Sequence, residues 1–524
     1  MCGPWSFHRE KGVAQWNMEK QRKAARGAES HRFENLTAAE AVARLREIYV
    51  AAVKALQTDL QAYLTDRSKP SKAAREQGRY CYPRLIVVWK GVDEEDDDAP
   101  LHLRHPVVNR AFARFSRPGT YSSSITRPDL FGEEIRTQLE LLQTDYNAEI
   151  SVGVSDQEIP YPYVLDGAGL DLNSVSAFDL ARHFPTTELA LIGNEVADGM
   201  ELLDAEGHRP LALFDGLRTD FSLARLKHYT GTPAEHIQSY ILMTNYHRYV
   251  DVFVAYALEQ LKRPDSPYTA LSCCGGIVIT KDTPNPLELI ANSPWRKFQM
   301  PSYHLLSPDR QGISLVNIGV GPANAKNITD HLAVMRPHVW LMIGHCGGLR
   351  PSQSIGDYVL AHAYLRDDHV MDNVLPREIP IPPIAEVQVA LQQAAVNITG
   401  QDGDALKKRL RTGTVVTTDD RNWELRYSSS ALLFSQSRAV AIDMESATLA
   451  AQGYRFRVPY GTLLCVSDKP LHGELKLPGQ ANHFYERAIA EHIDIGFETI
   501  NLLRQAGSKL HSRKLRAFDE PPFR

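Results

Sequence analysis

The sequence predicts an α/β protein whose main domain is a three-layer α/β/α sheet, preceded by a smaller α+β domain. From about residue 275, apolar runs of strand length alternate with helical segments, an order that favours a mostly parallel sheet covered by helices. Two of these runs end abruptly in a carboxylate, which places acids at the mouth of a β-α-β unit. Residues before 265 mix helices, short strands and Gly or Pro turns, a mixture typical of α+β domains.

The length of the chain sets the number of domains. At 524 residues it is too long for one hydrophobic core, so we expect two domains and two tails. The predicted divisions are a flexible leader at 1–35, an N-terminal domain at 36–265, a second domain at 266–507 and a tail at 508–524.

Composition excludes several classes of protein. A net charge of -5 argues against a nucleic-acid-binding surface. The six cysteines show no C-x-x-C spacing, so neither a disulfide framework nor a metal site is expected, which suits a reducing cytoplasm. No apolar run reaches the roughly 18 residues that a membrane helix needs, so no membrane association is expected.

The N-terminal domain begins with a long amphipathic helix, because apolar residues recur at helical spacing over 37–63. Strands are predicted at 84–89 and 149–154, with a helix at 138–144. We interpret the acidic run 93–98 as a solvated loop rather than a metal site, since it lacks the alternating ligands and glycine turn of a Ca²⁺ loop. A helix from Thr232 to about residue 261 ends at a Pro-rich break that marks the predicted domain boundary.

Arginines and hydroxyls between residues 104 and 136 are candidate phosphate ligands, because guanidinium groups match phosphate oxygens in pairs. The candidates are Arg114, Arg117, Ser122 and Arg127. Surface ion pairs are the alternative use of such residues. Asn245 and Arg248, predicted at i and i+3 on one helical face, could also reach a substrate, although helix packing is the commoner use of these residues.

The second domain contains the alternating elements. Strands are expected at 277–280, 315–320, 339–343, 358–362, 413–417, 439–442 and 461–466, and helices at 324–335, 384–395, 445–454 and 482–503.

The two acids that follow strands are Glu445 and Asp468. Strand carboxyl ends meet at one edge of a parallel sheet, so both side chains can face one ligand. Cleavage of a glycosidic bond needs two acids with different roles: one protonates the leaving group and the other stabilises an oxocarbenium ion. The alternative is structural, in which each acid caps a helix or pairs with a neighbour such as Lys469.

Met444-Glu445 after one strand and Ser467-Asp468 after the next resemble the signature of the nucleoside phosphorylase and nucleosidase superfamily. The Gly-rich run 344–350 and the Gly-Asp-containing strand 354–360 also resemble motifs of this superfamily. The amino-acid sequences of segments 361–368 and 467–473 are similar to those of bacterial AMP nucleosidases. The resemblance implies a nucleoside-phosphorylase-like fold. It also implies that Glu445 holds the ribose hydroxyls, Met444 packs under the sugar and Asp468 protonates purine N7.

Glycines after strands mark further candidate binding positions. Gly321 opens onto a helix N-terminus, which suits close approach of the backbone to an anion or ribose. In the resembled family, the turn at Gly347 lies by the nucleophile that attacks C1′, and Arg350 adds a cation. His345 could orient a water molecule, or it could be a buried structural histidine. The family's Gly-Asp-Pro phosphate loop is replaced by residues 280–284, which favours water over phosphate as nucleophile.

The base pocket of the resembled family corresponds here to the segment after strand 413–417. Trp423 could stack on a purine while Asp420 or Asn422 reads its amino edge. Core packing is the competing interpretation for Trp423.

The expected function is therefore hydrolysis of AMP to adenine and ribose 5-phosphate, in purine salvage and control of the adenylate pool. For Asp468 to act as an acid near neutrality, its pKa must be raised by burial against the opposite pull of Lys469. A phosphate-dependent purine nucleoside phosphorylase and a non-catalytic adenine-nucleotide sensor are the alternatives. The resemblance further implies a homohexamer, activation by MgATP and inhibition by phosphate, with no cofactor required for the chemistry.

Overall fold

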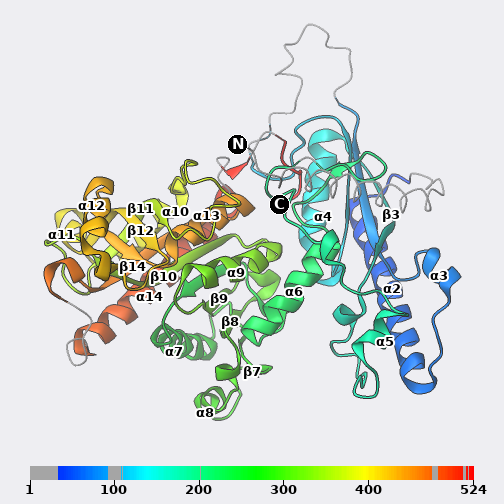
Figure 1. Cartoon of the computed structure of the whole chain (residues 1–524), viewed down its shortest axis with the longest axis horizontal. Coiled ribbons are helices and arrows are strands. Elements are labelled where there is room, and N and C mark those ends of the chain that lie inside the picture. Colours follow the sequence, from blue (N-terminus) through cyan, green and yellow to red (C-terminus); the bar gives the residue numbers. More distant parts are fainter. Residues whose placement is uncertain are drawn as a thin grey trace, which may run out of the picture. The chain divides into compact units, whose positions relative to one another are not determined.

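The computed structural model describes residues 34–91, 108, 110–200, 202–474, 482–510, 515–516 and 519–524. Residues 1–33 of the predicted leader and the acidic run 93–98 lie outside these residues. Contacts divide the described chain into two compact units (Figure 1), one containing residues up to Phe221 together with 519–524, and one containing 222–516. No helix among the described residues combines the length and apolarity that a membrane crossing requires.

The first unit is an α+β structure, as predicted. Its four strands lie in the order β3-β1-β2-β4, with bounds β1 (Cys81–Trp89), β2 (Gly119–Ser124), β3 (Glu149–Glu158) and β4 (Arg209–Pro210). The helices are α2 (Ala38–Asp66), α3 (Lys72–Glu76), α4 (Pro128–Tyr146), α5 (Ala177–Ala181) and α6 (Gly216–Thr230), the last of which crosses the division between the units.

Helix α2 begins at a capping box, because the Thr37 hydroxyl accepts a hydrogen bond from Glu40 N while the Glu40 carboxylate accepts one from Thr37 N. Its apolar stripe, which includes Leu56 and Leu60, packs in the core of the unit with Phe184. The pattern that predicted this helix from sequence therefore corresponds to its buried face.

The C-terminal residues complete the first unit. Phe523 is buried and its N–H donates to Leu211 O at 3.0 Å, while the guanidinium of Arg524 pairs with Glu134 at 2.8 Å. Within the predicted tail at 508–524, residues 520–524 are thus packed against the first unit.

We expect Phe523→Ala to lower the free energy of unfolding by about 3 kcal/mol, because it empties a buried aromatic site. Phe178→Ala, at a side chain that is 67% exposed in the same unit, is the matched control. Calorimetric unfolding of both variants measures the difference, and equal transition temperatures would show that the tail contributes nothing to stability.

The second unit contains a ten-stranded sheet in the order β13-β12-β11-β14-β10-β5-β9-β8-β6-β7. The bounds are β5 (Tyr240–Thr244), β6 (Ala270–Cys273), β7 (Ile277–Ile279), β8 (Ser302–Leu306), β9 (Ile313–Asn317), β10 (Val339–Gly348), β11 (Tyr358–Asp367), β12 (Leu410–Thr418), β13 (Ala441–Asp443) and β14 (Tyr460–Asp468). The helices are α7 (Arg248–Lys262), α8 (Pro286–Ala291), α9 (Pro322–Leu332), α10 (Ala385–Thr399), α11 (Gly403–Arg409), α12 (Tyr427–Ser437), α13 (Ser446–Phe456) and α14 (Asn482–Ala506).

Helices form two packed groups around this sheet: α9 lies against α13, and α7 and α10 lie against α14. Both α13 and α14 also contact β10 and β14. Every strand predicted after residue 275 is present. The predicted parallel pairing is present between β12 and β13, β11 and β12, β10 and β14, β5 and β10, and β5 and β9. Antiparallel pairs of β10 with β13, β11 with β14, β8 with β9, β6 with β8 and β6 with β7 make the whole sheet mixed.

Strand β5 corrects two further predictions. Residues 240–244 were expected to be helical, but they form a strand between β10 and β9. All five side chains of this strand are buried, so its sequence lacks the alternation of apolar and polar residues that identifies a half-buried strand. Its Leu and Met residues precede helix α7 closely, so the two segments were predicted as one helix. Because β5 and α7 belong to the second unit, the boundary lies at 221/222 rather than near residue 265.

The pairing of β13 with β10 closes a ring of strands, β10-β14-β11-β12-β13. In that ring β10 lies between the two strands that carry the predicted catalytic acids. Gly347 on β10 is opposite Ile442 of β13 on one side and Asp468 of β14 on the other. The ring therefore brings the ends of β13 and β14 to the same place.

Candidate active site

Glu445 lies at the centre of this edge and is completely buried. Its Oε1 accepts a hydrogen bond from Gly321 N at 2.6 Å, and its Oε2 accepts one from Asn245 Nδ2 at 3.0 Å. The three residues follow β13, β9 and β5. A carboxylate has about four lone-pair sites, so each Glu445 oxygen can still accept a second hydrogen bond, as from a ribose hydroxyl.

Burial raises the pKa of Glu445, and the neighbouring charge of Asp443 raises it further. The hydrogen bonds from Gly321 and Asn245 act in the opposite direction. Without ligand, the carboxyl group therefore holds a proton more readily than an exposed glutamate. A bound cationic sugar would favour its ionised form.

Asp443 is a buried acid of the site that the sequence analysis did not single out. Its Oδ1 accepts from Thr417 Oγ1 at 2.6 Å, and its Oδ2 accepts from the Ser446 amide at 3.0 Å and from the Ser446 hydroxyl. These bonds hold the first turn of α13 against β12 and so position Glu445. The Asp-x-x-Ser spacing, typical of helix capping, was the signal in the sequence.

Asp468 ends β14 on the other side of β10. The Ser467 hydroxyl lies 3.2 Å from Cys346 O and also within hydrogen-bond distance of Asp468 Oδ1. The Ser467 hydroxyl is the donor in both contacts, so it links the Asp468 carboxyl group to the backbone of β10.

The thiol of Cys346, on β10, lies near the ends of both acidic strands. Burial raises its pKa, and the charges of Cys465, Asp443 and Asp468 raise it further. Since one strand separates β13 from β14, their backbones are about 10 Å apart at this edge. The two strand ends that supply Glu445 and Asp468 therefore meet at one edge.

His345 is buried, with its ring centroid 4.8 Å from that of Tyr246 and 5.3 Å from that of Tyr249. It thus packs against one aromatic residue of the β5–α7 connection and one of the first turn of α7, an environment that fits the structural-histidine alternative. Gly347 lies in β10 between the acidic strands, and the amide of Arg350 in the following turn donates to Gln353 Oε1 at 2.8 Å.

Asn245 and Arg248 do not share a helical face, which corrects their predicted arrangement. Asn245 follows β5 and is buried, whereas Arg248 is the exposed first residue of α7. Asn245 Oδ1 has no hydrogen-bond partner among the described residues, so it is available to a ligand donor. The sequence pattern did not predict that a strand ends just before Asn245 and so places it against Glu445.

Trp423 occupies a hydrophobic cluster with Leu349, Val416, Phe434 and Ile442, and its ring meets Phe434 edge-on at 5.1 Å. The packing interpretation therefore describes it better than stacking on a purine. Asp420 pairs with Arg426 at 2.7 Å and accepts from Asn422 N, so both residues proposed to read the base take part in a local turn.

We expect Trp423→Ala to lower the free energy of unfolding by about 3–5 kcal/mol. The KM for substrate should change less than threefold, because the ring packs in the core rather than on the ligand. Chemical denaturation and steady-state kinetics on the same preparation test this, and a large KM increase with unchanged stability would restore the stacking role.

The candidate phosphate ligands of the first unit have intramolecular partners. Arg117 pairs with Asp519 at 3.7 Å, Arg127 with Asp129 at 2.8 Å, and Ser122 Oγ donates to Asp204 at 2.7 Å. Arg114 donates to Arg110 O at 3.5 Å. These contacts correspond to the surface ion-pair alternative rather than to an open phosphate site.

Three groups in the first unit approach one another as metal ligands would: Asp204, Glu206 and His208. The guanidinium of Arg84 pairs with Asp204 and, at 2.8 Å, with Glu206. A guanidinium of the protein therefore already contacts both carboxylates and balances one of their two charges, so the donor set does not call for a metal ion.

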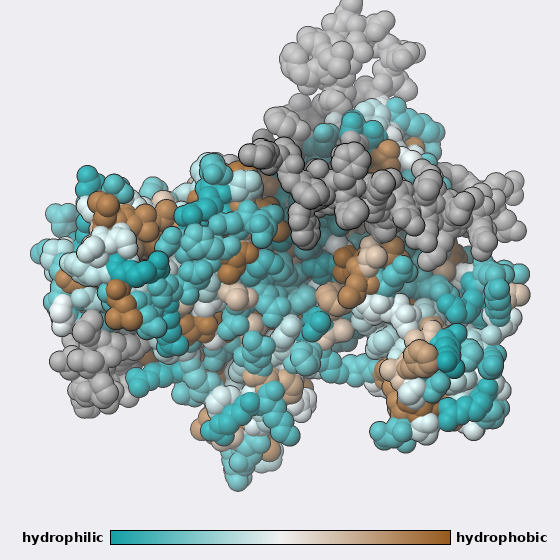
Figure 2. Space-filling view, viewed as in Figure 1, coloured by the Kyte–Doolittle hydropathy of each residue, from teal (hydrophilic) through white to brown (hydrophobic). Residues whose placement is uncertain are grey.

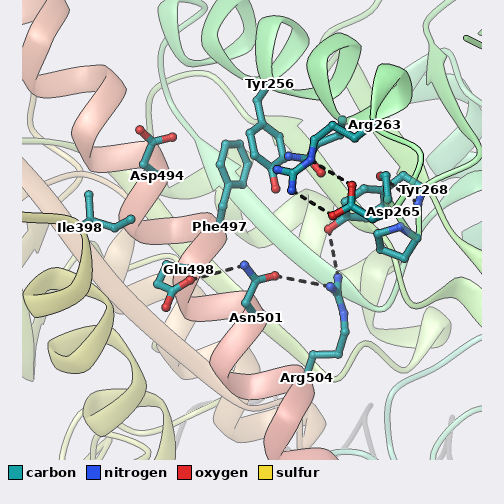
Figure 3. Close-up of a pocket in the computed structure, with 13 residues that line it drawn as sticks. Tyr256, Arg263, Asp265, Tyr268, Ile398, Asp494, Phe497, Glu498, Asn501 and Arg504 are labelled. Carbon is teal, nitrogen blue, oxygen red and sulfur yellow. Dashed lines mark hydrogen bonds and ion pairs between the residues drawn. The ribbon is translucent and has the colours of Figure 1, made fainter.

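A cavity of about 380 Å³ lies at the other end of the sheet (Figure 3). It is lined by residues from α7, the 265–268 connection and α14, including Tyr256, Asp494 and Arg504. The Arg504 guanidinium lies 5.3 Å from the ring of Tyr240, which is the first residue of β5. The site of Glu445 lies at the opposite end of β5, beyond its last residue. This cavity is thus separate from the acids.

Comparison with known proteins agrees with this geometry. The chain is 60% identical to AMP nucleosidase of Escherichia coli (strain K12) over 489 residues, which cover 93% of this chain and 99% of the relative. The chain belongs to the AMP nucleosidase family. Residues 40–208 match the family described as bacterial AMP nucleoside phosphorylase N-terminus, and residues 277–495 match the phosphorylase superfamily. The predicted fold class and resemblance are confirmed.

More distant similarities cover less of the chain. A guanosine phosphorylase of Halorubrum lacusprofundi is 25% identical over 38% of this chain and 80% of its own length. The crystal structure of an AMP nucleosidase from Bacteroides thetaiotaomicron is 28% identical, with a TM-score of 0.40, and covers 55% of this chain and 98% of that one. The match to the Escherichia coli AMP nucleosidase extends over both units.

Proposed function

We propose that this protein is an N-glycosidase that hydrolyses AMP to adenine and ribose 5-phosphate. The observation that carries the proposal is the near-complete, 60% identical match to an AMP nucleosidase. The convergence of the ends of β13 and β14 at one edge of the sheet supports it, because this edge presents two acids on either side of β10.

The proposed mechanism divides the charge that develops as the N9–C1′ bond stretches. Asp468 donates its proton to N7 of the purine, so the base leaves neutral. Glu445 accepts hydrogen bonds from the ribose hydroxyls and, once ionised, stabilises the positive charge on the sugar. Water then adds to C1′, and one of its protons passes through solvent to the Asp468 carboxylate, which restores the acid. Asn245 and Gly321 hold the Glu445 carboxylate for this role.

The decisive experiment is to incubate the purified protein with AMP in phosphate-free buffer, with and without MgATP, and to measure free adenine by chromatography. Adenine and ribose 5-phosphate without added phosphate support hydrolysis. Release only with phosphate identifies a phosphorylase, and no release under either condition identifies a nucleotide sensor.

Regulation, assembly and location form a further part of the proposal. We infer activation by MgATP, inhibition by phosphate, a homohexamer and a cytoplasmic location, with no cofactor in the chemistry. Exposed apolar side chains around α12 support assembly: Leu425, Tyr427 and Leu432 are 87%, 57% and 59% exposed. Brown patches lie over this end of the second unit in Figure 2. Light scattering and kinetics with each effector test these points.

A further inference from the structure

The turn that follows β14 encloses an ion pair. Lys469 Nζ lies 2.6 Å from Glu474 Oε1, and the two side chains are 8% and 46% exposed. The backbones of the same two residues also pair, because Lys469 N donates to Glu474 O at 2.7 Å and Glu474 N to Lys469 O at 3.3 Å. The lysine charge is therefore largely removed from water and has one carboxylate partner close to it.

This turn lies against the end of β10. A Cβ atom on Gly348 would be 3.2 Å from Lys469 Cγ, and one on Gly347 would be 3.5 Å from the ring of Pro470. Gly347 is the residue opposite Asp468 in the sheet. The lysine stem thus packs against the end of β10, next to the glycine that faces Asp468 across the sheet.

A buried ammonium group at this place opposes the chemistry, since a nearby positive charge favours the ionised form of a carboxyl group. Other charged groups also lie near this turn among the described residues. The Cys346 thiol is affected by the charges of Asp443 and Asp468, and Asp357 is affected by those of Lys469, Arg409 and Arg411. Lys469 is the cation adjacent to Asp468 in sequence, and Glu474 is the anion in direct contact with it.

We propose that Glu474 is a positioning residue that neutralises Lys469 and thereby lets Asp468 keep the proton it transfers to the departing purine. This inference rests on the proposed function. The turn after β14 then has an electrostatic role as well as a structural one. The Glu474 carboxylate acts on Asp468 through Lys469, without contacting the substrate.

The test is the pH dependence of kcat for AMP hydrolysis. In Glu474→Gln the uncompensated lysine should move the alkaline fall in kcat to lower pH by about one unit, with the KM for AMP unchanged. In Lys469→Met the fall should stay in place or move to higher pH. Adding Glu474→Gln to Lys469→Met should then have no further effect, because the charge to be compensated is absent.

Glu378→Gln, at an exposed glutamate elsewhere in the second unit, is the control for the loss of one negative charge. A lowered melting temperature of Glu474→Gln without a shift in the pH profile would reduce the pair to a structural role and overturn the inference. A shift that persists in the Lys469→Met background would also overturn it. Wild-type protein that releases no adenine would refute the proposed function itself, before any variant is compared.

Discussion

Replacing Asp468 with asparagine should lower kcat for AMP hydrolysis by about 10²–10⁴-fold, the usual contribution of a general acid. Asparagine keeps the size of the side chain and can still donate a hydrogen bond to N7, but it cannot transfer a proton. AMP binding should therefore remain within about threefold of wild type. Single-turnover kinetics give the first quantity and calorimetric titration with AMP gives the second.

Asp420→Asn is the matched control for this substitution. Asp420 follows a neighbouring strand and was also a candidate from the sequence, but it pairs with Arg426 at 2.7 Å. Its variant should keep kcat within about twofold. Wild-type turnover in Asp468→Asn, or an equal loss in both variants, would remove Asp468 from its assigned role.

Replacing Glu445 with glutamine should produce the second large effect, a loss of about 10²–10³-fold in kcat, comparable to removal of one electrostatic contact to a transition state. The amide can still accept from Gly321 N, and Asn245 can turn its Oδ1 toward the new NH₂ group. The local structure should therefore survive, while the negative charge opposite the sugar is lost. Steady-state and single-turnover rates measure the change.

The same substitution should increase stability toward alkaline pH. Burial and Asp443 raise the pKa of Glu445 in the folded state, whereas in the unfolded chain it ionises near 4.5. Above that pH the folded protein binds more protons than the unfolded chain, so the stability contributed by this group is lost as pH rises toward the folded pKa. Glutamine does not titrate and escapes this loss.

Melting temperatures at pH 5 and pH 8 check the prediction: the advantage of Glu445→Gln over wild type should be larger at pH 8. Glu378→Gln, at an exposed site, should show no such difference. An advantage that is the same at both pH values would mean that the carboxyl group is already ionised in the folded protein.

Functional residues could be predicted from sequence where one short segment contains both a strand and the residue that follows it. Glu445 and Asp468 each follow an apolar run directly, so the run predicts the strand and places the acid at its end. The β13–β10 pairing that brings the two strand ends together joins residues about a hundred positions apart. No local pattern contains that information.

Asn245 and Trp423 show why the remaining predictions failed. The strand before Asn245 is buried on both faces, so it lacks the alternation that separates strands from helices, and its link to Glu445 spans 200 positions. Trp423 lies at the expected place in the chain, but the direction of its side chain depends on Phe434 and Ile442, which pack against it. A single sequence does not specify which face of a turn is buried.

The return of residues 519–524 to the first unit has a practical consequence for fragment studies. A protease that nicks the backbone between residues 221 and 222 would sever only one of the two covalent passages between the units. The larger fragment would still hold Phe523 and Arg524 in the smaller one, so the pieces should co-purify. Isolation of the amino-terminal portion as a well-behaved sample would therefore require supplying the final hexapeptide, fused or added in trans.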